Sequence, residues 1–238
     1  LIALSTDPAP ARREICLSAG VNEYLVKSSG ALVALDEVLG RIFRADTPAD
    51  IPVKDDEIKE EQPKDDGKNG WLVVFLSAKG GTGTSSLCAN LAMNIQQGQP
   101  EERVVVADLV LPIGSIGQIV GEAGKINLVT VSDLPFGQTN IDYFRRNLPK
   151  SQLWQFQLLA GSPDPQQANS LKGERIGQIV DTLCSAYDFV ILDIGRSLSR
   201  ISLPLIQQAD LIPLIVSTDQ STVKLTRTVW EYLQAQDI

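Results

Sequence analysis

A continuous apolar run, Trp71–Ser77, leads through a glycine loop into a helical pattern, and this order constrains the fold more than any other feature of the chain. The loop reads Lys-Gly-Gly-Thr-Gly-Thr-Ser over residues 79–85. Glycines let the backbone approach an anion closely, and the N–H groups at the start of a helix point at it. The spacing is that of a P-loop and predicts a phosphate cradle, with Ser85 at the Mg²⁺ position and Thr84 where the consensus has lysine. A glycine-rich turn that binds no ligand is the alternative.

The composition limits the chemistry that is open to the chain. With 238 residues and 43% hydrophobic content, it is long enough to bury a sizeable core. Its net charge of −8 opposes a broad attraction to nucleic acid or anionic lipid. Histidine is absent, which excludes Ser-His and Cys-His nucleophiles and histidine metal ligands. No apolar run approaches the ~20 residues that span a bilayer and no signal peptide begins the chain, so we expect a cytoplasmic protein.

The chain divides into three segments of different character. Residues 1–44 read as strand, helix, strand, helix, which is half of an α/β domain. They resemble the last two β/α units of a response-regulator receiver domain, which would place Ser5 at its switch position and Lys27 at its phosphate-contacting position. Residues 45–70 are rich in proline and acidic residues and are expected to form a flexible linker. Residues 71–238 are expected to form the main, nucleotide-binding domain. We also expect the chain to be truncated at both ends.

From Trp71 onward, short apolar runs alternate with helical patterns. Uninterrupted apolar runs suit strands that are covered on both faces, and their alternation with helices predicts a doubly wound, mostly parallel α/β sheet. Right-handed crossovers would place all ligand loops at one edge of this sheet. The predicted strands are 72–76, 104–107, 156–159, 189–192 and 211–216, and an amphipathic helix is predicted over 140–148.

Two aspartates directly follow predicted strands. Asp108 follows the run 104–107 and Asp193 follows the run 189–192, so both are expected at the carboxyl edge, where open α/β sheets bind ligands. We expect both carboxylates to serve a nucleotide, with Asp193 and Ser85 holding Mg²⁺; a carboxylate that only caps the next loop is the alternative. The residues predicted to bind the nucleotide are Lys79, Gly80, Gly81, Thr82, Gly83, Thr84, Ser85, Ser86, Asp108 and Asp193.

The glycine loop resembles the deviant loop KGGxGK[ST] of the MinD/ParA family of dimerising ATPases. In that family the early lysine, here Lys79, reaches the nucleotide of the partner subunit, and the second aspartate of an Asp-x-Asp pair positions the attacking water. Val110 occupies this second position. No catalytic residue is predicted, because Thr84 and Val110 replace the usual groups and phosphoryl transfer depends on positioning and charge stabilisation. The resemblance implies a protein that binds ATP and Mg²⁺ with weak or no hydrolysis.

Residues 193–199 resemble the D-x-P-R-x-L run of the TadZ/CpaE branch, with Gly195 in place of its proline. The receiver-like half, the acidic linker and the GGxGTS loop match that branch as well. Arg196 could meet phosphate, the partner subunit or a nearby carboxylate, or form only a surface salt bridge. The resemblance implies a homodimeric localisation scaffold of Tad pilus assembly, polar or membrane-peripheral, whose partners are the pilus secretion ATPase and other Tad components. Nucleic acid is not an expected partner, and any membrane association is indirect.

Two other functions remain open at this level. One is an active MinD/ParA-like positioning ATPase, and the other is a nucleotide-free interaction module of a response regulator. The intact glycines and Ser85 favour nucleotide binding over the second alternative, while Thr84 and Val110 argue against the first.

Overall fold

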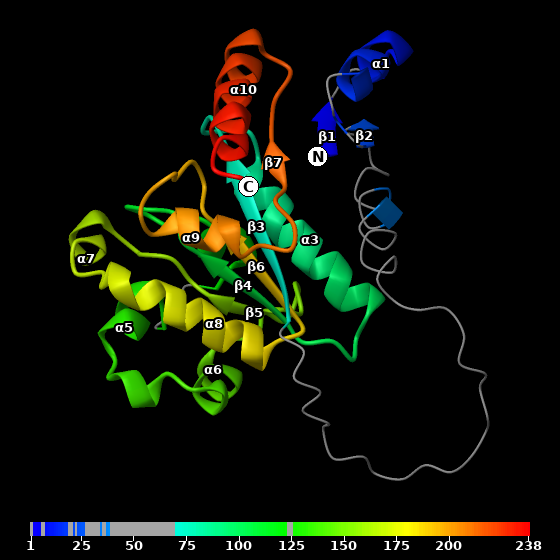
Figure 1. Ribbon diagram of the computed structural model, residues 1–238. Coiled ribbons are helices and arrows are strands. Elements are labelled where there is room, and N and C mark those ends of the chain that lie inside the picture. The colour runs from blue at the N-terminus through cyan, green and yellow to red at the C-terminus, as the bar shows by residue number, and fades with distance from the viewer. Residues whose placement is uncertain are drawn as a thin grey trace, which may run out of the picture.

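A five-stranded parallel sheet lies at the centre of the fold (Figure 1). The computed structural model describes residues 2–5, 8–18, 21, 23–26, 34, 37–38, 70–122 and 126–238. The strands are paired in the order β5-β4-β6-β3-β7, and every pairing is parallel. They are β3 (Trp71–Ser77), β4 (Val104–Asp108), β5 (Gln157–Leu159), β6 (Phe189–Asp193) and β7 (Leu214–Ile215). The predicted doubly wound parallel α/β fold is confirmed.

Helices cover both faces of this sheet, on opposite sides in Figure 1. One face packs against α3 (Thr84–Gly98) and α4 (Ile116–Val120). The other face packs against α5 (Leu128–Asp133), α6 (Ile141–Asn147), α8 (Ile176–Ala186), α9 (Ser202–Gln207) and α10 (Gln220–Gln234). The shorter elements are η1 (Phe136–Gln138), α7 (Pro165–Ala168) and η2 (Gly173–Arg175).

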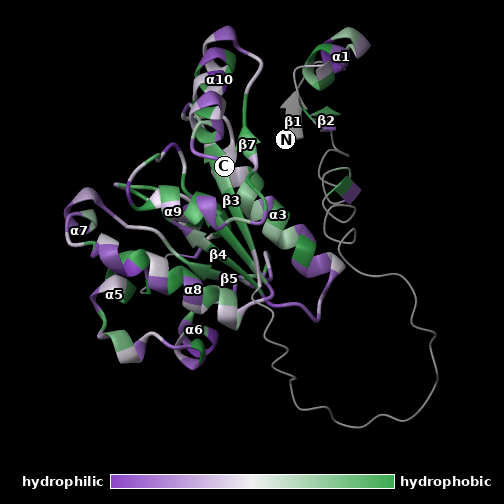
Figure 2. Ribbon diagram, in the orientation of Figure 1, coloured by the Kyte–Doolittle hydropathy of each residue, from purple (hydrophilic) through white to green (hydrophobic). Residues whose placement is uncertain are grey.

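The two-sided burial explains why the strands read as continuous apolar runs. Along β3, Leu72, Val74 and Leu76 face one core cluster, while Val73 and Phe75 face the other. Successive side chains of a strand point to opposite faces, so a strand between two helical layers needs an apolar residue at each position. Figure 2 shows the central strands as predominantly hydrophobic.

The predicted fifth strand is shorter in the structure than in the sequence pattern. The run 211–216 is apolar, but only Leu214–Ile215 pair with β3 as a strand, preceded by an isolated bridge between Val73 and Leu211. Pro213 has no N–H and cannot donate to the ladder, which limits its regular pairing. Its carbonyl still accepts a hydrogen bond from Leu76 N at 3.1 Å.

The N-terminal region contains the predicted strand, helix and strand. These are β1 (Ile2–Ser5), α1 (Pro10–Ser18) and β2 (Glu23–Val26), and the two strands pair in parallel. The predicted helix at 32–43 and the linker at 45–70 lie largely outside the described residues. Gly70 is an exception, since its N–H donates to Cys184 O at 2.8 Å and a Cβ there would lie 1.9 Å from Tyr187 O. Gly70 is therefore part of the folded domain and not of the linker. Among the described helices, none has both the length and the apolar character to cross a membrane.

Candidate functional site

The loop between β3 and α3 forms an open cradle at the start of the helix. Gly81 and Gly83 have φ angles of 78° and 89°, a left-handed backbone that glycine adopts without strain. Gly83 is the N-cap of α3, and no side chain caps the helix there. A Cβ atom at Gly80, Gly81 or Gly83 would meet nothing within 4 Å. The cradle therefore faces open space with the uncapped N–H groups of a 15-residue helix, an arrangement suited to an anion.

Thr84 does not replace the charge of the consensus lysine. Its side chain is buried, and its Oγ1 lies 3.0 Å from Thr82 Oγ1. Thr82 Oγ1 in turn donates to the carbonyl of Lys79 at 3.2 Å. The two hydroxyls therefore brace the loop from within and supply no cation to it.

Lys79 forms an ion pair with a residue of its own chain. Its Nζ lies 3.2 Å from Asp219 Oδ1 and 3.3 Å from Ser221 Oγ. Asp219 is also the N-cap of α10, where it accepts a hydrogen bond from Thr222 N. Hydrogen bonds from Ser217 and Thr222 are the main reason that the pKa of Asp219 lies well below its usual value. Both partners of the pair are about half exposed, so the ion pair contributes little to stability.

Asp193 lies under the cradle at the end of β6. Its side chain is fully buried; Oδ1 accepts a hydrogen bond from Gly195 N at 2.9 Å, and Oδ2 has no hydrogen-bond partner among the described residues. Burial raises the pKa of this carboxyl, and the adjacent Ser85 side chain and the Gly195 N–H partly offset the rise. A buried carboxylate oxygen without a partner costs free energy unless a ligand or ion satisfies it.

Asp108 takes the capping role that the sequence left as an alternative. Its Oδ1 accepts from Val110 N at 3.0 Å, and its Oδ2 accepts from Ser115 N at 2.7 Å and Ile116 N at 2.9 Å. These bonds hold the loop from β4 into α4. Burial raises the pKa of Asp108 to about 6, against the lowering effect of the Ile116 N–H. Because both oxygens are occupied by backbone donors, the structure favours capping over direct contact with a nucleotide.

Val110 and Gly195 meet at the far wall of the site. A Cβ at Gly195 would lie 3.2 Å from Val110 Cγ2, and Gly195 has a φ of 60°. Proline is locked near −65° and cannot adopt this backbone, so Gly195 replaces the proline of the resembled motif with a different local turn. Val110 therefore packs against this turn and brings no carboxylate to the site.

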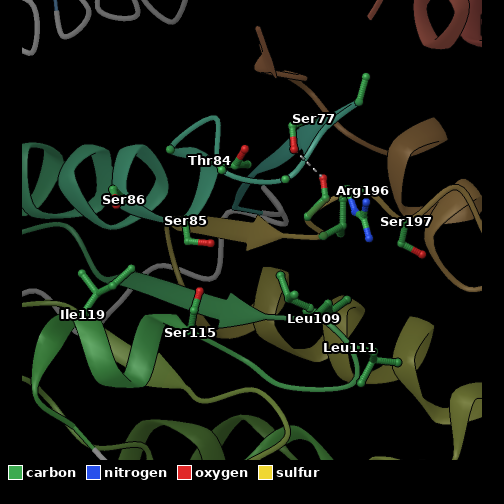
Figure 3. A pocket seen from close by; sticks show the side chains of 17 residues that line it. Ser77, Thr84, Ser85, Ser86, Leu109, Leu111, Ser115, Ile119, Arg196 and Ser197 are labelled. Atoms are coloured by element: carbon green, nitrogen blue, oxygen red, sulfur yellow. Dashed lines mark hydrogen bonds between the residues drawn. The ribbon is translucent and has the colours of Figure 1, made fainter. Parts of the chain in front are cut away.

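One cavity of about 770 Å³ joins these loops (Figure 3). It includes six of the predicted nucleotide-binding residues: Gly80, Gly81, Gly83, Thr84, Ser85 and Ser86. Lys79, Thr82, Asp108 and Asp193 are not among its lining residues. Lining residues that the sequence did not single out include Ser77, Leu111, Ser115, Ile119 and Ser197. Their only sequence signal is that they follow strand ends, or lie in the next helix, at the same sheet edge.

The oxygen donors of Ser85 and Asp193 fit Mg²⁺. Ser85 lies in the cavity wall, and Asp193 offers a buried carboxylate oxygen without a partner. Hydroxyl and carboxylate oxygens are hard ligands that suit this ion, which usually keeps several waters and binds phosphates as well. Ser85 and Asp193 are thus the residues that would hold it.

The chain has the fold of solved MinD and ParA ATPases, a parallel α/β sheet with a glycine loop between its first strand β3 and the helix α3. A cell division ATPase MinD of Pyrococcus furiosus superposes with a TM-score of 0.57 at 19% identity, covering 70% of this chain and 68% of that one. A ParA family ATPase of Chlorobium tepidum gives 0.56 at 21% identity, covering 66% and 64%. A septum site-determining protein MinD of Pyrococcus horikoshii, solved with Mg-ADP, gives 0.53 at 16% identity, covering 70% and 66%.

Two curated proteins are similar in sequence as well. An uncharacterized ATP-binding protein of Methanocaldococcus jannaschii is 28% identical over 163 residues, which cover 63% of this chain and 62% of the relative. A protein of Oltmannsiellopsis viridis, assigned as a septum site-determining protein MinD, is 27% identical over 156 residues, covering 64% and 45%. The chain thus spans less than two thirds of the length of either relative. No protein-family profile matches the chain.

Proposed function

We propose that this chain binds ATP with Mg²⁺ and uses the bound nucleotide to stabilise a homodimer that acts as a switch or scaffold. One observation carries the proposal: an open, uncapped glycine cradle and an unsatisfied Asp193 oxygen lie at the same edge of one sheet, beside a single cavity. The cradle suits the phosphates, and the carboxylate suits the metal that accompanies them. The names of the similar proteins, which include an ATP-binding protein and a MinD solved with Mg-ADP, support this choice.

Weak hydrolysis is the second part of the proposal. Thr84 braces the loop and brings no charge to the β/γ-phosphates, while Val110 packs against Gly195 and cannot orient water. Both groups that aid transfer in the resembled ATPases are thus replaced. An active positioning ATPase of the MinD/ParA kind is the alternative, and its turnover would have to come from other residues.

The surface around the cavity supports dimerisation. Leu111, Ile113 and Ile119 are 45%, 44% and 36% exposed, and two of them line the cavity mouth. Exposed apolar side chains along one segment, here residues 111–119, are typical of an interaction surface. The ion pair between Lys79 and Asp219 lies at the surface, so it can break with a small loss of free energy when a second copy with bound nucleotide approaches. We propose that Lys79 then reaches the phosphates of the partner's nucleotide.

The cellular role that we propose is a localisation scaffold for Tad-type pilus assembly, with the pilus secretion ATPase among its partners. It rests on the resemblance of residues 193–199, the GGxGTS loop and the receiver-like N-terminal half to the TadZ/CpaE branch. The N-terminal strand, helix and strand are compatible with a partial receiver-like unit at 1–44.

A Mg·ATP titration followed by thermal unfolding tests the nucleotide part of the proposal. A ligand present at 100 times its Kd stabilises the folded state by about 2.7 kcal/mol, which raises the unfolding temperature by several degrees. Absence of any shift would favour the nucleotide-free interaction module. A shift together with steady-state phosphate release at the usual rate of MinD-type enzymes would favour the active ATPase. Binding with far slower release is the expected result.

A further inference from the structure

The part of the cavity beside the glycine loop, where the phosphates would bind, has few cationic side chains around it. Asp108 and Asp193 are both fully buried at adjacent strand ends, where β4 and β6 pair them directly. Thr84 brings no charge, and Lys79 is held by Asp219. A nucleotide would add its phosphate charges beside these carboxylates, and opposite charge is needed to offset the repulsion.

Arg196 is the one cationic residue that lines the cavity in the described part of the chain. It is exposed, and its guanidinium forms no ion pair or hydrogen bond with another described residue. Other arginines of the same domain have such partners: Arg103 binds Asp188, Arg227 binds Glu231, and Arg175 donates to Thr139. The surface salt bridge and the nearby carboxylate considered from the sequence are therefore absent for Arg196 among the described residues.

The backbone on either side of Arg196 is held in place. The Gly195 carbonyl accepts hydrogen bonds from Ser77 N at 2.8 Å and Ser77 Oγ at 3.2 Å, and Ser197 N donates to Ile194 O at 3.1 Å. These bonds tie the turn to the end of β3, directly before the glycine loop. In Figure 3 the Arg196 side chain lies on the Ser77 and Ser197 side of the cavity, across from Ser85 and Ser86. A long side chain on a braced turn can meet a ligand in the cradle with little loss of backbone entropy.

We infer that Arg196 binds the phosphates of the nucleotide and supplies, within the same chain, the positive charge that Thr84 does not. The inference rests on the proposed nucleotide binding. Guanidinium is well suited to this task, because its planar fork donates two parallel hydrogen bonds to a phosphate and it stays charged at all relevant pH values. Asp193 lies three residues earlier, so one short segment, 193–196, would hold both the metal and the phosphates.

Calorimetric titration of Mg·ATP and Mg·ADP into the wild type, Arg196→Ala, Arg196→Lys and Arg200→Ala tests the inference. Arg200 is a matched control, since it is also an exposed arginine on the same segment but lines a different cavity, with Glu174 and Pro204. We expect Arg196→Ala to raise both dissociation constants by roughly 10- to 100-fold, the effect of losing hydrogen bonds to a charged group. Arg196→Lys should fall between it and the wild type, because it keeps the charge and loses the fork.

The salt dependence gives a readout that a merely structural role would not change. The affinity of the wild type should fall as KCl rises, and that of Arg196→Ala should fall less, because fewer charges attract the phosphates. Arg200→Ala should match the wild type within about twofold, since exposed charges away from the ligand contribute little. Equal affinities of wild type and Arg196→Ala, with both proteins binding, would overturn the inference and leave the proposed function standing. Failure of the wild type itself to bind either nucleotide would overturn both.

Discussion

Replacing Asp108 with asparagine should destabilise the domain while leaving nucleotide binding nearly intact. The carboxylate accepts three backbone N–H groups, one on Oδ1 and two on Oδ2. An asparagine side chain has one acceptor oxygen and one NH₂, so in its better orientation it leaves the Val110 N–H without an acceptor. A partly buried donor left without a partner costs up to about 1–3 kcal/mol, and we expect a loss of unfolding free energy within that range near neutral pH.

The size of this loss should depend on pH. Burial raises the pKa of Asp108 from 3.8 to about 6, so the folded state binds this proton more tightly than the unfolded state. The associated stability is fully present below pH ~4 and is lost as the pH rises through ~6; a shift of about two units corresponds to about 3 kcal/mol. Asparagine does not titrate. The difference in unfolding free energy between wild type and Asp108→Asn should therefore shrink by up to about 3 kcal/mol from pH 4 to pH 8.

Urea unfolding of both proteins at pH 4.5, 6 and 8 measures this difference. Asp181→Asn serves as the control, because Asp181 is exposed on α8 and its replacement should change stability little. A difference that stays flat across the three pH values would refute the reasoning about burial. Mg·ATP titration at pH 8 completes the test: a loss of affinity beyond about tenfold in Asp108→Asn would make this carboxylate a direct ligand after all.

Three further predictions concern the proposed dimer, the hydrolysis and the metal. Lys79→Ala should weaken ATP-bound dimers by roughly tenfold or more, the effect of losing one charged hydrogen bond. Equal dimer fractions of both proteins in sedimentation, with and without Mg·ATP, would contradict the proposed contact between Lys79 and the partner's nucleotide. Thr84→Lys combined with Val110→Asp should recover some phosphate release, whereas either substitution alone should have little effect. No gain in the double variant would show that residues beyond these two positions also limit hydrolysis. Asp193→Asn should raise the dissociation constant of Mg·ATP by about 10- to 100-fold, the usual effect of removing a residue that orients a metal. In EDTA, the wild type and Asp193→Asn should bind ATP with equal affinity. A difference in affinity that persists in EDTA would exclude a role of Asp193 through Mg²⁺.

Much of the fold could be predicted because its signals are local in the sequence. Four of the five strands lie within two residues of their predicted limits, and the helix predicted at 140–148 is α6, capped by Asn140. Buried parallel strands must be apolar at every position, so their runs are visible without knowledge of their neighbours. The strand at 211–216 was predicted too long, because apolar character alone does not show how Pro213 interrupts the ladder.

The site could be predicted only in part, since its chemistry depends on pairs that are distant in the sequence. The partner of Lys79 is Asp219, 140 positions away, and no local pattern links them. Asp108 and Asp193 have the same context in sequence, an aspartate after an apolar run. Three backbone donors surround the carboxylate of Asp108, while Asp193 keeps one oxygen that no described residue contacts by a hydrogen bond. Their roles therefore diverge only after the loops that follow β4 and β6 have folded.

The sequence by itself determined a parallel α/β sheet with a glycine loop at its carboxyl edge, because the alternation of apolar runs and the glycine spacing restrict the backbone directly. It also placed Thr84 and Val110 at the two positions where the resembled motif has lysine and aspartate. Only the tertiary structure decided where the remaining charges lie: Lys79 in an ion pair at the surface, Asp108 under its loop, and Arg196 at the cavity with no partner among the described residues. Electrostatic interactions depend on distance and burial, and both arise only when strands far apart in the chain are brought to one edge of the sheet.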